Sequence, residues 1–204
     1  MLERPALPLD APCAAELIAA TMGDFGQSLF GFGDRQRLLH ALEKLFSLKG
    51  NRFSHEYATL TETEGKTAGL LLAFPAGKQT PAQLKMVRAL PGIYGWRGAL
   101  RLLWRALPAA GMREMAKDEF YIAHLATAAE FRRKGVAKFL LQAAERLARA
   151  AGLSKLSLIV EPENQPAVNL YLASGFETVK VIQTPWLERG FHSNSHYRML
   201  KKLI

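Results

Sequence analysis

The chain has 204 residues, of which 49% are hydrophobic and 22% are charged, so it is long enough to bury one core and too apolar to be disordered. Its one cysteine, Cys13, excludes an internal disulfide and a cysteine-rich metal site, and we expect no metal and a cytoplasmic location. The net charge of +9 would suit nucleic acid, an anionic membrane surface or a phosphorylated cofactor, and it does not choose among them.

The first third of the chain predicts a strand, two helices and a hairpin. Asp10 and Asp34 stand where N-caps are favoured, and Pro12 lies in the first turn of the first helix, where a missing N–H costs nothing. The turn at Glu64-Gly65 separates two runs rich in threonine, aromatic and aliphatic residues. The predicted elements are a strand at Leu2–Pro5, helices at Ala11–Met22 and Arg35–Leu48, and hairpin strands at Phe53–Glu62 and Lys66–Phe74.

Residues 76–117 form a helical insertion that prolines and glycines divide into two or three short helices. Arg97, Arg101 and Arg105 share one face, and apolar residues fill the rest. Such a helix could form a wall of a substrate pocket, a contact in a homodimer or a membrane-surface anchor, or it could pack on the sheet with its arginines solvated. Because the arginines interrupt the apolar stretch, we expect no membrane span.

The second half alternates strands with helices, which indicates an α/β fold with a mixed sheet covered on both faces. We expect one domain over residues 1–204 that contains the insertion. The predicted elements are strands at Glu119–Thr127, Lys155–Val160, Phe176–Gln183 and His196–Leu203, and helices at Val136–Ala151 and Pro166–Ser174.

The link before Val136 carries an Arg-x-x-Gly-x-Ala pattern between a strand and an amphipathic helix. A helix N-terminus presents unpaired N–H groups and a partial positive charge, so phosphate oxygens can bind there through the backbone alone. Gly135 permits a tight turn, and Ala137 is small enough for a pyrophosphate to lie close. The basic residues around this turn are Arg132, Arg133, Lys134 and Lys138.

A second pattern follows the next predicted strand. Asn164 stands at the end of that strand, and Tyr171 follows it by two helical turns, so the two residues lie on one side of a groove. Gly175-Phe176 ends the helix. Asn164 could instead only cap this helix, and Tyr171 could only fill the core.

Together the two patterns closely resemble the GNAT superfamily of N-acetyltransferases, and the resemblance omits only the helical insertion. It implies the GNAT fold, acetyl-CoA as cofactor, and direct transfer of an acetyl group to an amine. The backbone of Leu125, Ala126 and Thr127 would hold the pantetheine arm, and Tyr171 would protonate the departing thiolate. The pyrophosphate would lie on the loop and helix start formed by Arg132, Arg133, Lys134, Gly135, Val136, Ala137 and Lys138, and Asn164 would touch the pantetheine.

The general base is less well marked. An amine with a reference pKa of about 10.4 must lose a proton before it attacks, so a base or a water relay is required. His124 has the best intrinsic pKa, and we predict it to be the base. Glu119 and Glu161 are the other candidates. Glu119 and His124 point to opposite faces of their strand unless a bulge intervenes.

We expect the acceptor to be a primary amine of a small molecule or of a peptide. A non-catalytic acyl-CoA-binding sensor is the alternative. No nucleic-acid partner is expected, because the sequence lacks the interleaved aromatic and basic residues of such proteins.

Overall fold

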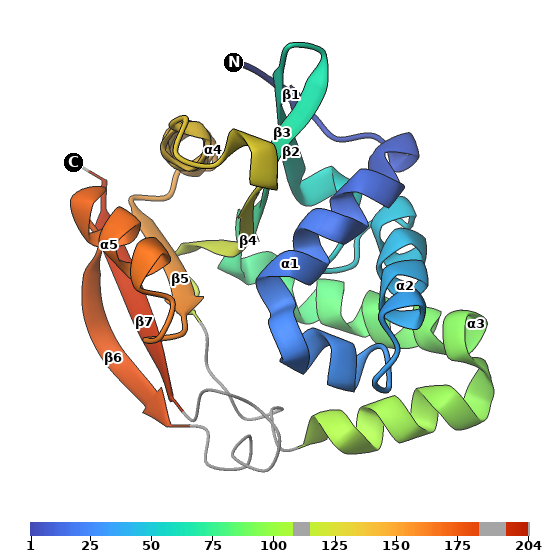
Figure 1. Ribbon diagram of the computed structural model, residues 1–204. Coiled ribbons are helices and arrows are strands. Elements are labelled where there is room, and N and C mark those ends of the chain that lie inside the picture. Colours follow the sequence, from blue (N-terminus) through green and yellow to red (C-terminus); the bar gives the residue numbers. More distant parts are fainter. Residues whose placement is uncertain (108–114, 184–194, 204) are drawn as a thin grey trace.

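The computed structural model describes residues 1–107, 115–183 and 195–203. Their strands form one mixed sheet in the order β1-β2-β3-β4-β5-β7-β6, with β4 and β5 parallel and the other neighbours antiparallel (Figure 1). The strands are β1 (Leu2–Pro5), β2 (Ala58–Thr63), β3 (Lys66–Pro75), β4 (Phe120–Thr127), β5 (Lys155–Val160), β6 (Glu177–Gln183) and β7 (Ser195–Lys202). The helices are α1 (Ala11–Leu29), α2 (Arg35–Ser47), α3 (Gln79–Ala106), α4 (Val136–Ala150) and α5 (Gln165–Ala173).

Helices cover the sheet on both faces, as the alternating strands and helices predict. The side chains of β3 alternate between two apolar clusters because successive residues of a strand point to opposite faces. Leu70 and Leu72 belong to the cluster formed with α1, α2 and α3, whereas Leu71 and Ala73 belong to the one formed with α4 and α5. Figure 1 shows the same separation, with α1, α2 and α3 on one side of the central strands and α4 and α5 on the other.

Three predictions differ from the structure by more than a single residue at an element's end, each for a local reason. The first helix continues to Leu29, but Gly23 has a φ of 52° and divides it at the predicted end. Residues 55–57 form a 3₁₀ turn capped by Ser54, so β2 begins at Ala58 rather than Phe53. In the insertion, Gly95 has a φ of 69° and joins two helical arms of α3, while Pro91 is accommodated within the first arm.

None of the described helices is both long enough and apolar enough to cross a membrane.

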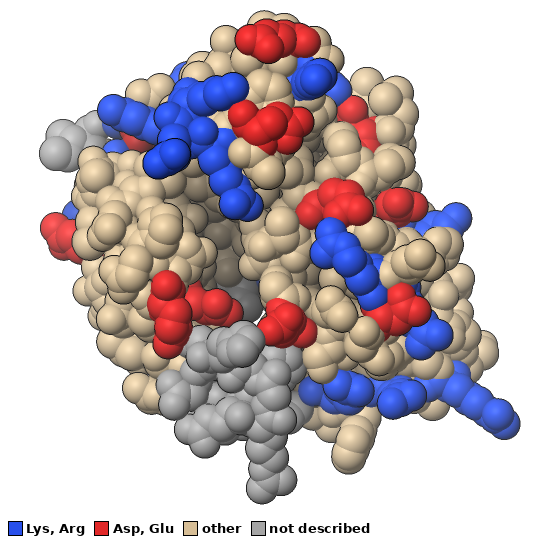
Figure 2. Space-filling model, viewed as in Figure 1, with Lys and Arg blue, Asp and Glu red and all other residues tan. Residues whose placement is uncertain are grey.

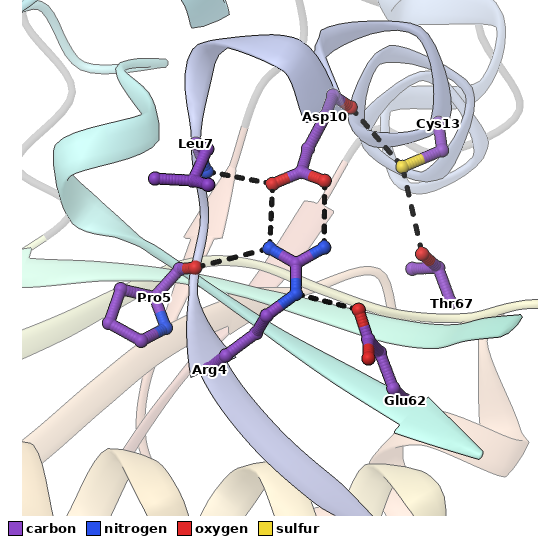
Figure 3. A network of polar contacts seen from close by, with 7 residues as sticks. All are labelled: Arg4, Pro5, Leu7, Asp10, Cys13, Glu62 and Thr67. Carbon is purple, nitrogen blue, oxygen red and sulfur yellow. Dashed lines mark hydrogen bonds and ion pairs between the residues drawn. The ribbon is translucent and has the colours of Figure 1, made fainter. Parts of the chain in front are cut away.

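Asp10 does not cap α1, contrary to the prediction. Its carboxylate instead accepts two hydrogen bonds of 2.8 Å from the Arg4 guanidinium and one of 2.7 Å from the Leu7 N–H (Figure 3). Arg4 also donates from Nε to Glu62 on β2 at 2.6 Å. A bidentate guanidinium pair is stronger than a helix cap, which explains the choice of partner. The network ties β1, β2 and the start of α1 together.

Replacing Asp10 by asparagine should lower the free energy of unfolding by roughly 2 kcal/mol at neutral pH, less than for a fully buried pair because Arg4 is half-buried. The hydrogen bonds from Arg4 hold the pKa of Asp10 below its ordinary value. The stabilisation is therefore present above pH ~4 and is lost as the pH falls through the lowered pKa. Urea unfolding of both proteins at several pH values measures this difference, which should shrink on acidification.

The matched control is Asp118→Asn, which removes an exposed ion pair with Lys155. It should leave stability nearly unchanged. Equal effects of the two substitutions would contradict a structural role for the Arg4 network.

Candidate active site

The parallel strands β4 and β5 separate part-way along their length. Their pairing runs from Phe120 opposite Leu156 to Ile122 opposite Leu158 and stops there, although both strands continue. On its other side β4 stays paired with β3, where a register shift lets Leu72 face His124 and Ala73 face Ile122. Ala123 is therefore the extra residue of a β-bulge, and the strands part next to it.

Beyond this point β4 presents backbone groups to the widening gap. The N–H of Ala128 donates a hydrogen bond to the carbonyl of Ala68 on β3, so the backbone groups of Ala128 point toward β3. Because backbone groups alternate in direction along an antiparallel strand, those of Leu125 and Thr127 point toward the side from which β5 has diverged. A ligand in the gap can hydrogen-bond them as an extra strand would.

Helix α4 begins with its first turn open. Gly135 precedes it with a φ of 82° and ψ of 2°, and no side chain caps the helix. A side chain at Gly135 would meet only the Met1 methyl group, at 3.8 Å, so the space above the turn is free. Arg133 also has a positive φ, of 60°. The uncapped N–H groups at the start of a helix can bind an anion, so this turn is a candidate anion site.

Basic side chains surround this turn. Arg132, Arg133, Lys134 and Lys138 are all exposed, and Lys134 lies 5.2 Å from the centroid of the Phe131 ring. Figure 2 shows basic side chains gathered at one end of a hollow in this face of the molecule and acidic side chains at its other end. Glu161 and Glu163, both exposed, follow directly after β5. The hollow therefore has a positive and a negative end.

Tyr171 lies on α5 and is 8% exposed. Its ring packs against Phe176 with centroids 5.7 Å apart, which confirms that it contributes to the core beside α4 and α5. Burial raises the pKa of its phenol to about 12, so the hydroxyl keeps its proton at neutral pH. Buried tyrosine hydroxyls usually have a partner, and none is found within the described residues, which leaves this one available to a ligand.

Asn164 is the N-cap of α5. Its side-chain oxygen accepts a 3.3 Å hydrogen bond from the N–H of Ala167. The capping alternative is therefore present in the structure. The bond uses the oxygen alone and leaves the exposed amide NH₂ group of Asn164 to face solvent or a ligand.

His124 follows the bulge and faces α1. Its Nδ1 lies 2.7 Å from the Thr21 hydroxyl, which itself donates to the Ile18 carbonyl at 2.7 Å. The hydroxyl has one proton, so Nδ1 is the donor to it and Nε2 carries the lone pair. The ring stacks on Phe53 at 5.6 Å, and burial together with the nearby Arg52 charge lowers the pKa of His124 to about 3. The imidazole is therefore neutral at physiological pH.

The other candidate bases are placed differently. Glu119 is buried immediately before β4, where it accepts a 2.6 Å bond from Arg198 and a 2.9 Å bond from the Ala116 N–H. The extra residue of the bulge shifts the alternation of side chains along β4 by one position. Glu119 and His124, five residues apart, therefore lie on the same face of the strand rather than on opposite faces. Sequence reasoning missed Thr21, Phe53 and Arg198, which hold these two residues, since no local signal links positions so far apart in the chain.

Comparisons with known proteins identify the family of the chain. The family model described as "Acetyltransferase (GNAT) family" matches residues 52–176, a span that contains β4, α4, β5 and α5. The chain belongs to the GNAT acetyltransferase family. The solved structure of an N-acetyltransferase from Staphylococcus aureus Mu50 superimposes with a TM-score of 0.72 at 22% identity, covering 98% of this chain and 100% of that one. A structure described only as an acetyltransferase gives 0.68 at 20% identity, with both chains covered completely.

A curated relative of this GNAT protein is the chloroplastic GCN5-related N-acetyltransferase 4 of Arabidopsis thaliana, 30% identical over 100 residues. The match spans 48% of this chain and 34% of that relative's length. Together with the family model it supports membership of the GNAT acetyltransferase family, and the two superimposed structures confirm the predicted fold. The unpaired edge of β4 and the open turn of α4 fit acetyl-CoA, because they offer hydrogen bonds to an amide-containing arm and a cationic backbone cradle to a pyrophosphate.

Proposed function

We propose that this GNAT enzyme transfers the acetyl group of acetyl-CoA to a primary amine of a small molecule or a peptide, by direct attack of the amine. The observation that carries the proposal is the divergence of β4 from β5 beside the uncapped start of α4. In this proposal the phosphates of the cofactor lie on α4 and its arm follows β4. The acetyl group at the end of the arm then reaches the bulge at Ala123, next to His124. We assign Tyr171 on α5 to the same end of the cofactor.

The cofactor-binding residues in this proposal have distinct roles. The N–H groups at the start of α4, from Val136 to Lys138, bind the pyrophosphate, with Gly135 leaving room for it. The side chains of Arg132, Arg133 and Lys134 add positive charge. Leu125, Ala126 and Thr127 form the stretch of β4 along which the pantetheine arm lies, and the Asn164 amide contacts that arm. Acetyl-CoA supplies a thioester with an electrophilic carbonyl carbon and a thiolate leaving group.

Tyr171 donates a hydrogen bond to the departing sulfur. A phenol with a pKa of about 12 is a weaker acid than a thiol, whose reference value is about 8.5. The phenol therefore stabilises the developing thiolate through a retained O–H bond more readily than by losing its proton. This stabilisation acts where negative charge appears and so lowers the barrier rather than strengthening ground-state binding.

His124 has a more limited part than its intrinsic pKa suggests. A group whose conjugate acid has a pKa of about 3 is too weak a base to deprotonate an ammonium ion. The amine must therefore lose its proton to water before or during attack. The lone pair on Nε2 can still accept a hydrogen bond from the neutral amine and orient it. We therefore assign His124 to positioning of the acceptor, with water as the proton acceptor.

The charges at the two ends of the hollow support an amine acceptor. The anionic cofactor belongs at the basic end of the hollow, and a cationic amine is attracted to its acidic end. Glu161 and Glu163, exposed directly after β5, are the acidic residues that we assign to the amine. Phe53 and Phe30, buried in edge-on contact at 5.6 Å, make the wall behind His124 apolar.

The test is release of free CoA thiol from acetyl-CoA in the presence of a panel of small primary amines and short peptides with free N-termini. Turnover with at least one class supports the proposal, and the rate at low amine concentration should rise with pH toward the amine's own pKa without a break near 6.5. Acetyl-CoA binding without turnover on any amine would contradict it. A clear inflection near 6.5 that His124→Gln removes would show that His124 is the base after all.

A further inference from the structure

The second arm of α3 exposes an unusual row of large apolar side chains. Trp96 is 76% exposed and Trp104 is 74% exposed, and Leu100 and Leu107 are also mostly exposed. These four residues are spaced by four and three positions, so they share one face of the helix. The opposite side of the arm packs on the core through Ala99 and Leu102. Contiguous exposed apolar surface of this kind marks an interaction site rather than an ordinary solvated face.

Arginines line one edge of this apolar row. Arg97, Arg101 and Arg105 each follow a member of the row by one position, which places them about 100° further around the helix. None of the three forms an ion pair with a described residue. Figure 2 shows basic side chains in a line where Figure 1 draws this arm.

Arg97 and Arg101 border an open pocket of ≈ 720 Å³ between α2 and α3, to which Arg37 and the acidic Asp34 also contribute. Three guanidinium groups gather over one ring in it: Arg101, Arg37 and Arg105 lie 5.0, 5.8 and 5.9 Å from the centroid of Phe32. Phe32 has a φ of 54°, a strained conformation for a non-glycine residue. Stacking holds the guanidinium groups in place. Arg105 also donates one hydrogen bond of 2.9 Å to the Ser28 hydroxyl, and the remaining N–H groups suit phosphate oxygens.

We propose that this arm of α3 docks on an anionic lipid bilayer, with the tryptophans and leucines entering the interface and the adjoining arginines binding lipid phosphates. The proposal does not depend on the acetyl-transfer function, because none of the residues that border the pocket belongs to β4, β5, α4 or α5.

The positive charge of α3 favours an anionic bilayer over a second copy of the chain as the partner of this surface. The whole of α3 carries Lys85, Arg88, Arg97, Arg101 and Arg105 and no aspartate or glutamate, so two copies meeting at this helix would bring like charges together. An anionic surface instead attracts the arginines while the apolar row is buried. Tryptophan is also enriched where a protein meets the headgroup region, because its ring is apolar and its N–H is polar.

The experiment uses the full chain with Trp186→Phe, so that fluorescence reports Trp96 and Trp104 alone. The probes are phosphatidylcholine vesicles with and without about 30 mol% phosphatidylglycerol, in saturating CoA to occupy the basic turn at α4. We expect a blue shift of emission and co-sedimentation with the anionic vesicles only, both reduced in about 1 M NaCl. Trp96→Ala/Trp104→Ala should weaken co-sedimentation at least about tenfold.

The charge variant is Arg97→Gln/Arg101→Gln/Arg105→Gln, and it should weaken co-sedimentation about 100-fold, or roughly fivefold per arginine. Its matched control is Arg132→Gln/Arg133→Gln/Lys134→Gln, which removes the same charge from the α4 turn. The control should lose affinity for acetyl-CoA and keep its vesicle binding, whereas the α3 variants should behave in the opposite way.

The inference is overturned if both triple variants bind anionic vesicles as well as the parent protein does. It is equally overturned if both variants lose vesicle binding to the same extent. It is also overturned if the parent protein does not bind anionic vesicles at all. A further contradicting result is a blue shift that develops without lipid while light scattering shows that the mass of the protein doubles. The last result would assign the apolar row to a second copy of the chain. Loss of acetyl transfer with intact vesicle binding would count against the proposed function alone.

Discussion

Replacing Gly135 by glutamate is expected to reduce the affinity for acetyl-CoA by at least about 100-fold, or ~2.7 kcal/mol. The residue has a φ of 82°, which a side chain disfavours by roughly 1–2 kcal/mol, and it lies where the α4 N–H groups are free. A carboxylate there occupies the position of the pyrophosphate and repels it. Isothermal titration calorimetry with acetyl-CoA measures the loss directly.

Gly65→Glu is the matched control for that substitution. Gly65 has a φ of 72° in the turn between β2 and β3, and nothing lies within 4 Å of a side chain built there. It therefore introduces the same strain and the same charge away from α4. We expect both variants to lose some stability and only Gly135→Glu to lose cofactor binding. Unchanged acetyl-CoA affinity in Gly135→Glu would mean that the phosphates bind elsewhere.

Tyr171→Phe is expected to lower kcat by about 10- to 100-fold, or ~1.4–2.7 kcal/mol, and to leave the KM for acetyl-CoA within about threefold. The substitution keeps the ring contact with Phe176 and removes only the hydroxyl. Because burial raises the pKa of the phenol to about 12, the wild-type enzyme should not lose activity through this group at any pH below about 10. Steady-state kinetics across pH 7 to about 10 test both statements.

Tyr57→Phe serves as the comparison for Tyr171→Phe. Tyr57 is half-buried beside β2 and packs on Phe74 with ring centroids 5.3 Å apart, and burial raises its pKa as well. The same loss of one hydroxyl there should not change kcat. A wild-type kcat in Tyr171→Phe would reduce Tyr171 to a core residue, the alternative that its packing against Phe176 already makes reasonable.

The two basic surfaces of the molecule have different designs. At α4 the positive charge surrounds the uncapped backbone N–H groups of a helix start, which suits a small phosphorylated cofactor. At α3 the arginines adjoin two exposed tryptophans, which suits an extended surface. The two proposals therefore assign the net charge of +9 to two separate surfaces.

Much of the fold was predictable because its signals are local. Short sequence patterns predicted the glycine before α4, the strand β5 and the Asp34 cap of α2. In the structure the Asp34 carboxylate accepts hydrogen bonds from the N–H groups of Gln36 and Arg37. Predictions failed where a distant partner competed with a local one. Asp10 occupies a capping position, yet Arg4 and the Leu7 N–H bind its carboxylate in the folded chain.

By itself the sequence predicted the family and, through that resemblance, the cofactor and the segments expected to bind it, because the first turn of a helix and the glycine before it are properties of consecutive residues. Only the tertiary structure decided the environment of His124. The bulge at Ala123 set the direction of its ring, Thr21 on α1 fixed its tautomer, and burial beside Phe53 and Arg52 lowered its pKa to about 3. Desolvation depends on which side chains surround a group, and these come from three separate parts of the chain.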